Sequence, residues 1–174
     1  MQTYCSCLDW STTEKYQDAQ SIDEFLAESE EADHRCIRSI PSRIWRSDST
    51  LQYIYVSDAL ADLVNHVAPD MRSAVANLSL CIHWPVSIDE LGLAKLPDSC
   101  YFASISPSRV QALLQEFESL DLAALGAVHE RTRSADVSKE WPDVRDCFVG
   151  YLEQWRDTLA FAAKLKHGLI GGQG

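Results

Sequence analysis

Two thiols one residue apart, Cys5 and Cys7, are the first side chains in the sequence that could do chemistry. A closed zinc site needs about four ligands in paired clusters, usually with two to four residues between partners. A redox pair would take the form Cys-x-x-Cys at the start of a helix. Neither pattern is present, and buried free cysteine commonly packs as a small hydrophobic residue. We therefore expect Cys5 and Cys7 to lie in the core, with no metal and no cofactor bound.

A second group of reactive side chains lies in the middle of the chain and comprises Cys81, His83, Asp98 and Cys100. A cysteine nucleophile needs a nearby histidine and an orienting acid, and these residue types supply both. They define an alternative hypothesis, a small hydrolase or transferase, or a ligand-binding accessory protein, with its site here. The sequence contains no HExxH, Gly-x-Ser-x-Gly or Walker motif, so we assign no catalytic residue and favour a protein that is not an enzyme.

Acidic residues are concentrated at the start of the chain. The 174 residues include 26 Asp and Glu against 15 Lys and Arg, which gives a net charge of −11. Residues 1–33 contain nine acids and one lysine, a net −8, and are followed by Arg35, Arg38, Arg43 and Arg46. A negative field repels phosphate backbones, so nucleic acid is not an expected ligand. The charge fits either simple solubility or a basic protein partner.

The candidate partner-binding residues are six of the nine acids of this first segment and one tryptophan flanked by arginines. They are Asp23, Glu24, Glu28, Glu30, Glu31, Asp33 and Trp45. Acidic side chains steer a basic partner, and exposed aromatic residues anchor interfaces. The alternative is a solvated helix face, and the sequence leaves open whether the basic segment 35–46 folds back onto the acids.

Periodicity and capping residues predict the elements that must position these side chains. Ser106 and Pro107 mark a helix start, and the spacing of Val110, Leu113 and Phe117 continues it. The run at 50–67 is apolar nearly throughout, so it is either a strand followed by a helix or one helix. The predicted strands are 2–8, 100–105 and a short one at 169–170. The predicted helices are 12–18, 22–31, 71–82 and 107–119, with a continuation of the last at 122–128. A final long helix is predicted from Trp141-Pro142 to a cap at Gly168.

These elements indicate an α+β fold, in which helices, including a long C-terminal helix, pack on a small and mostly antiparallel sheet. We expect a single domain over residues 1–174, with 168–174 as a loose glycine tail and His129 to Glu140 as an exposed connection. No apolar run approaches the length of a membrane span, and no signal peptide is expected. Scattered free cysteines favour the cytoplasm.

From Tyr101 onward the chain resembles the YfbM-like family of small bacterial proteins of unknown function. The residues that carry the resemblance are Tyr101-Phe102-Ala103, Ser106-Pro107 with Val110, the Phe117–Leu125 segment, Trp141-Pro142, Tyr151-Leu152, Phe161-Ala162-Ala163 and Gly168-Leu169-Ile170. The resemblance implies an α+β domain with helices against a small sheet, and no activity. Family members that look like neighbours of polymorphic toxins add the hypothesis of an immunity role.

The sequence therefore favours a non-catalytic cytoplasmic protein that binds another protein. In one form of this hypothesis it is an immunity protein, which neutralises a bacterial toxin by occluding the active surface of a basic toxin domain. Homodimerisation through the long C-terminal helix is a further alternative.

Overall fold

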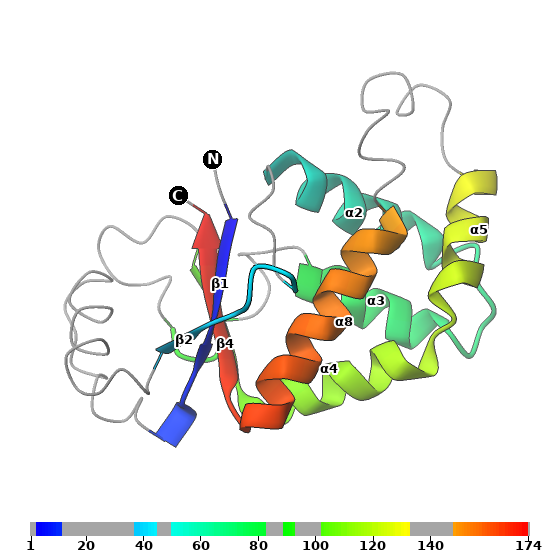
Figure 1. Cartoon of the computed structure of the whole chain (residues 1–174). Helices are drawn as coiled ribbons and strands as arrows, with labels where there is room; N and C mark the ends of the chain where they lie inside the picture. Colours follow the sequence, from blue (N-terminus) through cyan, green and yellow to red (C-terminus); the bar gives the residue numbers. More distant parts are fainter. Residues whose placement is uncertain are drawn as a thin grey trace.

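The structure, a computed structural model, describes residues 3–11, 37–44, 50–82, 89–92, 102–132 and 148–173. The protein is α+β: five described helices pack beside a four-stranded antiparallel sheet (Figure 1). The strands are β1 (Thr3–Leu8), β2 (Ile37–Ser39), β3 (Phe102–Ile105) and β4 (Gly168–Gln173). The helices are α2 (Thr50–Leu63), α3 (Arg72–Ile82), α4 (Pro107–Ser119), α5 (Leu122–Thr132) and α8 (Phe148–Leu165).

The C-terminal strand β4 lies inside the sheet, whose strand order is β2-β1-β4-β3. It pairs antiparallel with both β1 and β3, and Leu169 lies opposite Cys7 on one side and Ile105 on the other. Residues paired in this way project from the same face of a sheet, and these three are buried in the core. For residues 168–173 the expected loose tail is therefore wrong, because ladder hydrogen bonds from two neighbours hold this glycine-rich segment in a strand, and Gly174 lies outside the described residues.

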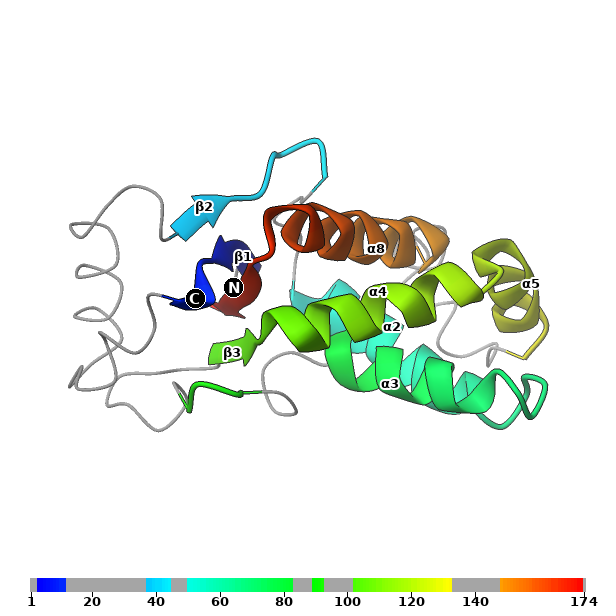
Figure 2. The same cartoon turned by 90° about the horizontal axis from the view of Figure 1, so that it is seen from below.

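The helices form a layer against one face of the sheet, and Figure 2 shows α8, α4 and α3 side by side in that order. The predicted apolar stripe of α4 is confirmed, since Val110, Leu113, Leu114 and Phe117 are all buried. Its predicted start is also confirmed: the N–H of Arg109 donates to Oγ of the N-cap Ser106. In α8, Trp155 is 0% exposed and is the largest fully buried side chain among the described residues. One hydrophobic cluster thus joins the helices to the sheet.

In the ambiguous run at 50–67, residues 50–63 fold as one helix, α2, and not as a strand followed by a helix. Val56, Leu60 and Leu63 are buried at a spacing of three to four residues. This is the helical period, and it places all three on the side that meets the core; the buried Val67 lies in the turn that follows α2. The predicted helices at 71–82 and 107–119 are α3 and α4. The predicted helices 12–18 and 22–31 lie outside the described residues.

The helix α5 is longer than expected, and His129 is not part of an exposed connection. The ring of His129 is 4% exposed and stacks on Phe148 with a centroid separation of 4.2 Å and an interplanar angle of 9°. The polar run that begins at His129 favoured a loop. In the structure, stacking on Phe148 buries this histidine, and α5 continues through it to Thr132.

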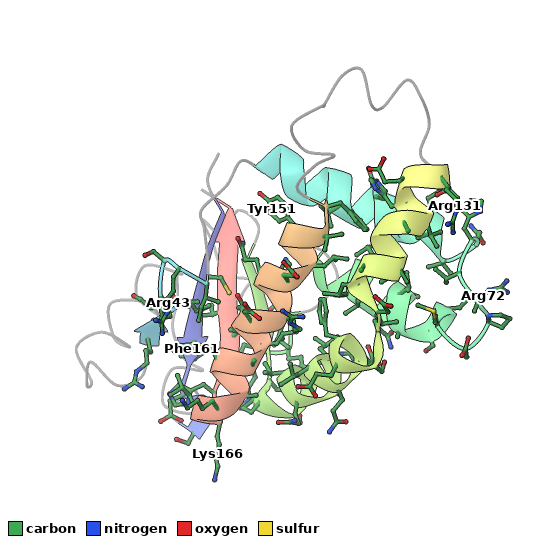
Figure 3. The ribbon with its side chains drawn as sticks, turned by 45° about the vertical axis from the view of Figure 1, so that its right-hand side comes forward. Arg43, Arg72, Arg131, Tyr151, Phe161 and Lys166 are labelled. Atoms are coloured by element: carbon green, nitrogen blue, oxygen red, sulfur yellow. The ribbon has the colours of Figure 1, made fainter. Side chains whose placement is uncertain are left out.

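The end of α8 also differs from the prediction, which placed its cap at Gly168. Lys166 adopts the left-handed conformation, with φ 58°. The N–H groups of Lys166 and His167 donate to the carbonyls of Ala163 and Ala162, which is the pattern of a Schellman cap. Figure 3 shows the Lys166 side chain projecting from this end of α8.

Gly168 is the first residue of β4, where an added Cβ atom would meet the ring of Trp10 and the carbonyl oxygen of Ile105. A close approach of neighbouring atoms, rather than helix capping, therefore requires glycine at this position.

Candidate functional site

The two thiols of β1 are packing groups, as the sequence indicates. Cys5 and Cys7 are buried thiols that are not joined in a disulfide, and both belong to the hydrophobic cluster. Burial raises the pKa of the Cys7 thiol to about 12, and the positive charge of Arg38 on the neighbouring strand offsets part of this increase. The thiolate is the reactive form of cysteine, so this environment suppresses nucleophilic chemistry at Cys7.

The candidate partner-binding residues predicted from the sequence, Asp23, Glu24, Glu28, Glu30, Glu31, Asp33 and Trp45, all lie outside the described residues. In the alternative enzyme site, Cys81 belongs to α3, but the structure does not describe its side chain. His83, Asp98 and Cys100 lie outside the described residues. Among the residues that the structure does describe, no three His, Cys, Asp or Glu side chains gather as they would around a metal ion.

Several described carboxylates stabilise the fold. The clearest examples are Asp89 and Glu90, in a turn at residues 89–92 that lies along β3. Oγ of Ser104, which is 0% exposed, donates to Oδ1 of Asp89 at 2.7 Å and accepts from the N–H of Leu91 at 2.9 Å. The carboxylate of Glu90 accepts from the N–H of Ser106. Gly92, with φ 74°, allows the turn to close. Both acids therefore hold this turn against the sheet.

Other carboxylates fix helices. Oδ1 of Asp121 accepts from the N–H of Ala124 at 3.0 Å and caps α5, which satisfies a free amide of the first turn. Between α3 and α4, Nδ2 of Asn77 donates to Oε1 of Glu116 at 2.8 Å. These groups already have intramolecular partners, which fix the orientation of their carboxylates.

Four exposed carboxylates remain available to a binding partner. Within the described ranges, no hydrogen bond or ion pair engages Asp58 of α2, Asp70 of the α2–α3 connection, Glu118 of α4 or Glu153 of α8. Two of these acids have a second exposed acid one helical turn further on: Asp62 follows Asp58, and Asp157 follows Glu153. Like charges at this spacing destabilise a helix slightly.

The available carboxylates were not singled out by sequence reasoning. Their only sequence signal is the i, i+4 spacing of the two acid pairs, because charge alone does not distinguish an acid that caps a helix from one that faces solvent. The available acids occur on several helices, so the negative surface of the described residues is distributed and is not confined to one segment.

Comparison with known proteins found no matching family model, no matching curated protein and no matching solved structure. The resemblance of the C-terminal part to YfbM-like proteins therefore stays a prediction. Among the described residues, no helix is long and apolar enough to cross a membrane.

Proposed function

We propose that this protein is a non-catalytic cytoplasmic binding protein whose acidic surface receives a basic protein. In the immunity-protein form of the proposal, the partner is a bacterial toxin domain, and binding covers its active surface. The observation that carries the proposal is the set of exposed, unengaged carboxylates Asp58, Asp70, Glu118 and Glu153, in a chain of net charge −11.

Electrostatics explains how such a surface would work. Exposed charges of one sign raise the rate of encounter with an oppositely charged partner, and salt reduces this effect. The carboxylates with intramolecular partners contribute to the long-range field, but those partners limit how the carboxylates can turn toward a cation of the partner protein. The unengaged carboxylates contribute to the field and can also turn freely to form ion pairs. Neutralising them should therefore weaken binding more than neutralising an equal number of engaged ones.

The test compares two variants with the same change in net charge. The first neutralises unengaged acids with Asp58→Asn, Glu118→Gln and Glu153→Gln. The second neutralises acids that have partners within the chain, with Asp9→Asn, Asp62→Asn and Asp121→Asn. Each protein is immobilised and exposed at low salt to a lysate of its own host, and the retained proteins are identified and quantified.

We expect the wild-type protein to retain one basic protein in stoichiometric amount, and high salt to release it. The first variant should retain about tenfold less of it, which corresponds to about 1.4 kcal/mol distributed over three charges. The second variant should lose much less. If no basic protein is retained, or if the two variants lose it equally, the carboxylate surface is not the binding determinant and the proposal is wrong.

A further inference from the structure

The two-residue turn that joins α8 to β4, at Lys166 and His167, has an unfavourable backbone conformation. Among the described residues, Lys166 is the only one with a side chain whose φ is positive, at 58°. This left-handed conformation brings Cβ close to a carbonyl oxygen, and helices that end in it usually place glycine there. The turn is therefore held by the structure around it and not by the preference of its own residues.

The second residue of the turn contains an unsatisfied polar atom. Nδ1 of His167 is buried, and no hydrogen-bond partner for it is present among the described residues. An imidazole nitrogen is either a donor or an acceptor, so its burial without a partner is unfavourable in both tautomers. Two independent features, the left-handed backbone of Lys166 and this buried nitrogen, thus disfavour the same turn.

The strand β4, in contrast, has favourable contacts on both sides. It pairs at six positions with β1 and at four with β3. Leu169 and Ile170, whose side chains point to opposite faces of the sheet, are 0% and 2% exposed. These contacts need a strand of this sequence between β1 and β3, but they do not need it to come from the same copy of the chain. The favourable strand and the unfavourable turn can therefore be separated.

We propose that two copies of this chain exchange β4, so that the β4 of each copy lies between β1 and β3 of the other. In this dimer the turn at 166–167 is open and leads from α8 of one copy into the sheet of its partner. Every strand pair of the monomer forms again, while Lys166 leaves the left-handed conformation and His167 leaves its buried position. Exchange of an identical element is a low-cost route to a dimer, and a short strained hinge favours it.

The position of the turn allows it to open. Lys166 is exposed, and Figure 3 shows its side chain projecting away from the end of α8. Association has an entropic cost, so the exchanged dimer is expected at high protein concentration and the monomer at low concentration. The inference goes beyond the proposed function and does not depend on a basic partner.

The first test compares two variants with the same substitution and the same change in charge. Lys166→Gly removes the unfavourable conformation from the monomer, whereas Lys164→Gly changes an exposed residue in the last turn of α8, which is helical in both forms. We expect Lys166→Gly to weaken dimerisation about thirtyfold, because each of two turns contributes about fivefold. Lys164→Gly should change it by less than about twofold. Sedimentation equilibrium of the full chain measures both constants.

The second test locates the exchanged strand in the wild-type protein. Isotope-labelled and unlabelled chains are mixed at about 1 mM and incubated in mild denaturant, which lets β4 leave and re-enter the sheet before the denaturant is removed. Isotope-filtered NMR then detects only contacts between different copies. We expect such contacts between Ile170 of one copy and both Ser6 and Ser104 of the other, since these residues are paired in the sheet.

Three results would overturn the exchange. The chain could remain monomeric at about 1 mM after this treatment, or form a dimer whose contacts between copies lie outside the β1–β4 and β3–β4 pairs. In addition, equal effects of Lys166→Gly and Lys164→Gly on dimerisation would show that the turn does not drive it. None of these results bears on the retention of a basic protein, so the proposed function is tested separately.

Discussion

At the residue scale, the environment of Cys7 determines how its thiol responds to pH. Its pKa in the folded protein is about 12, raised by burial and lowered in part by Arg38, whereas an unfolded cysteine titrates near about 8.5. The pKa is higher in the folded state, so the contribution of the neutral thiol to stability is complete below about pH 8.5. It is lost as the pH rises from about 8.5 toward about 12, because only the unfolded chain releases the proton.

The variant Cys7→Ala isolates this contribution. We expect the difference in free energy of unfolding between wild type and Cys7→Ala to be constant below about pH 8.5 and to shrink by about 1.4 kcal/mol per pH unit above it. Urea unfolding of both proteins on either side of this pH measures the difference. A difference that does not change with pH would mean that the thiol ionises equally well in the folded state.

Also at this scale, substitutions at Lys166 and Gly168 should change the stability of the protein in opposite directions. Lys166→Gly should stabilise the protein by about 1 kcal/mol, because the left-handed conformation is costly for a residue with a side chain. Gly168→Ala should destabilise it by roughly 1–3 kcal/mol, because its methyl group overlaps Trp10 and Ile105. Denaturant midpoints of the two variants give both values. Gly168→Ala with wild-type stability would show that the contact relaxes without cost.

At the element scale, the start of α5 depends on the cap at Asp121. We expect Asp121→Ala to cost about 1 kcal/mol, because the amide of Ala124 loses its acceptor, while Asp121→Asn keeps an acceptor oxygen and costs little. Equilibrium unfolding of the two variants separates the hydrogen bond from the charge. Equal losses would indicate that the charge, rather than the cap, stabilises this helix.

The elements that sequence reasoning predicts well are those whose signals are local. The Ser106 cap, the proline after it and the buried stripe define α4, and the alternation around Cys5 and Cys7 defines β1. The glycine-rich β4 was only partly predicted, since hydrogen bonding to β1 and β3 on both sides holds it in place. That pairing is tertiary, and no local pattern at residues 168–173 indicates it. His129 was placed in a loop for the same reason, because its partner Phe148 is distant in sequence.

The candidate binding surface was likewise predictable from the sequence only in part. Composition predicts an acidic surface, which fits either simple solubility or a basic partner, but it does not separate Asp121, which caps a helix, from Glu153, which is unengaged. Only the folded structure shows which acids already have partners within the chain.

At the scale of the whole molecule, the net charge of −11 and the unengaged carboxylates on separate helices support the proposal that charge drives association with a basic protein. Such association is fast at low ionic strength and slows as salt screens the field, because the Debye length falls from about 30 Å at 0.01 M to about 8 Å at 0.15 M. A contact dominated by apolar burial would depend little on salt in this range.

The most direct measurement is therefore the association rate constant between the wild-type chain and the basic protein that it retains from its host, followed across this range of salt concentration. The account predicts a fall of at least about tenfold in the association rate, with a much smaller change in the dissociation rate. An association rate that does not change with salt would contradict it, and would mean that the acidic surface serves solubility and not recognition.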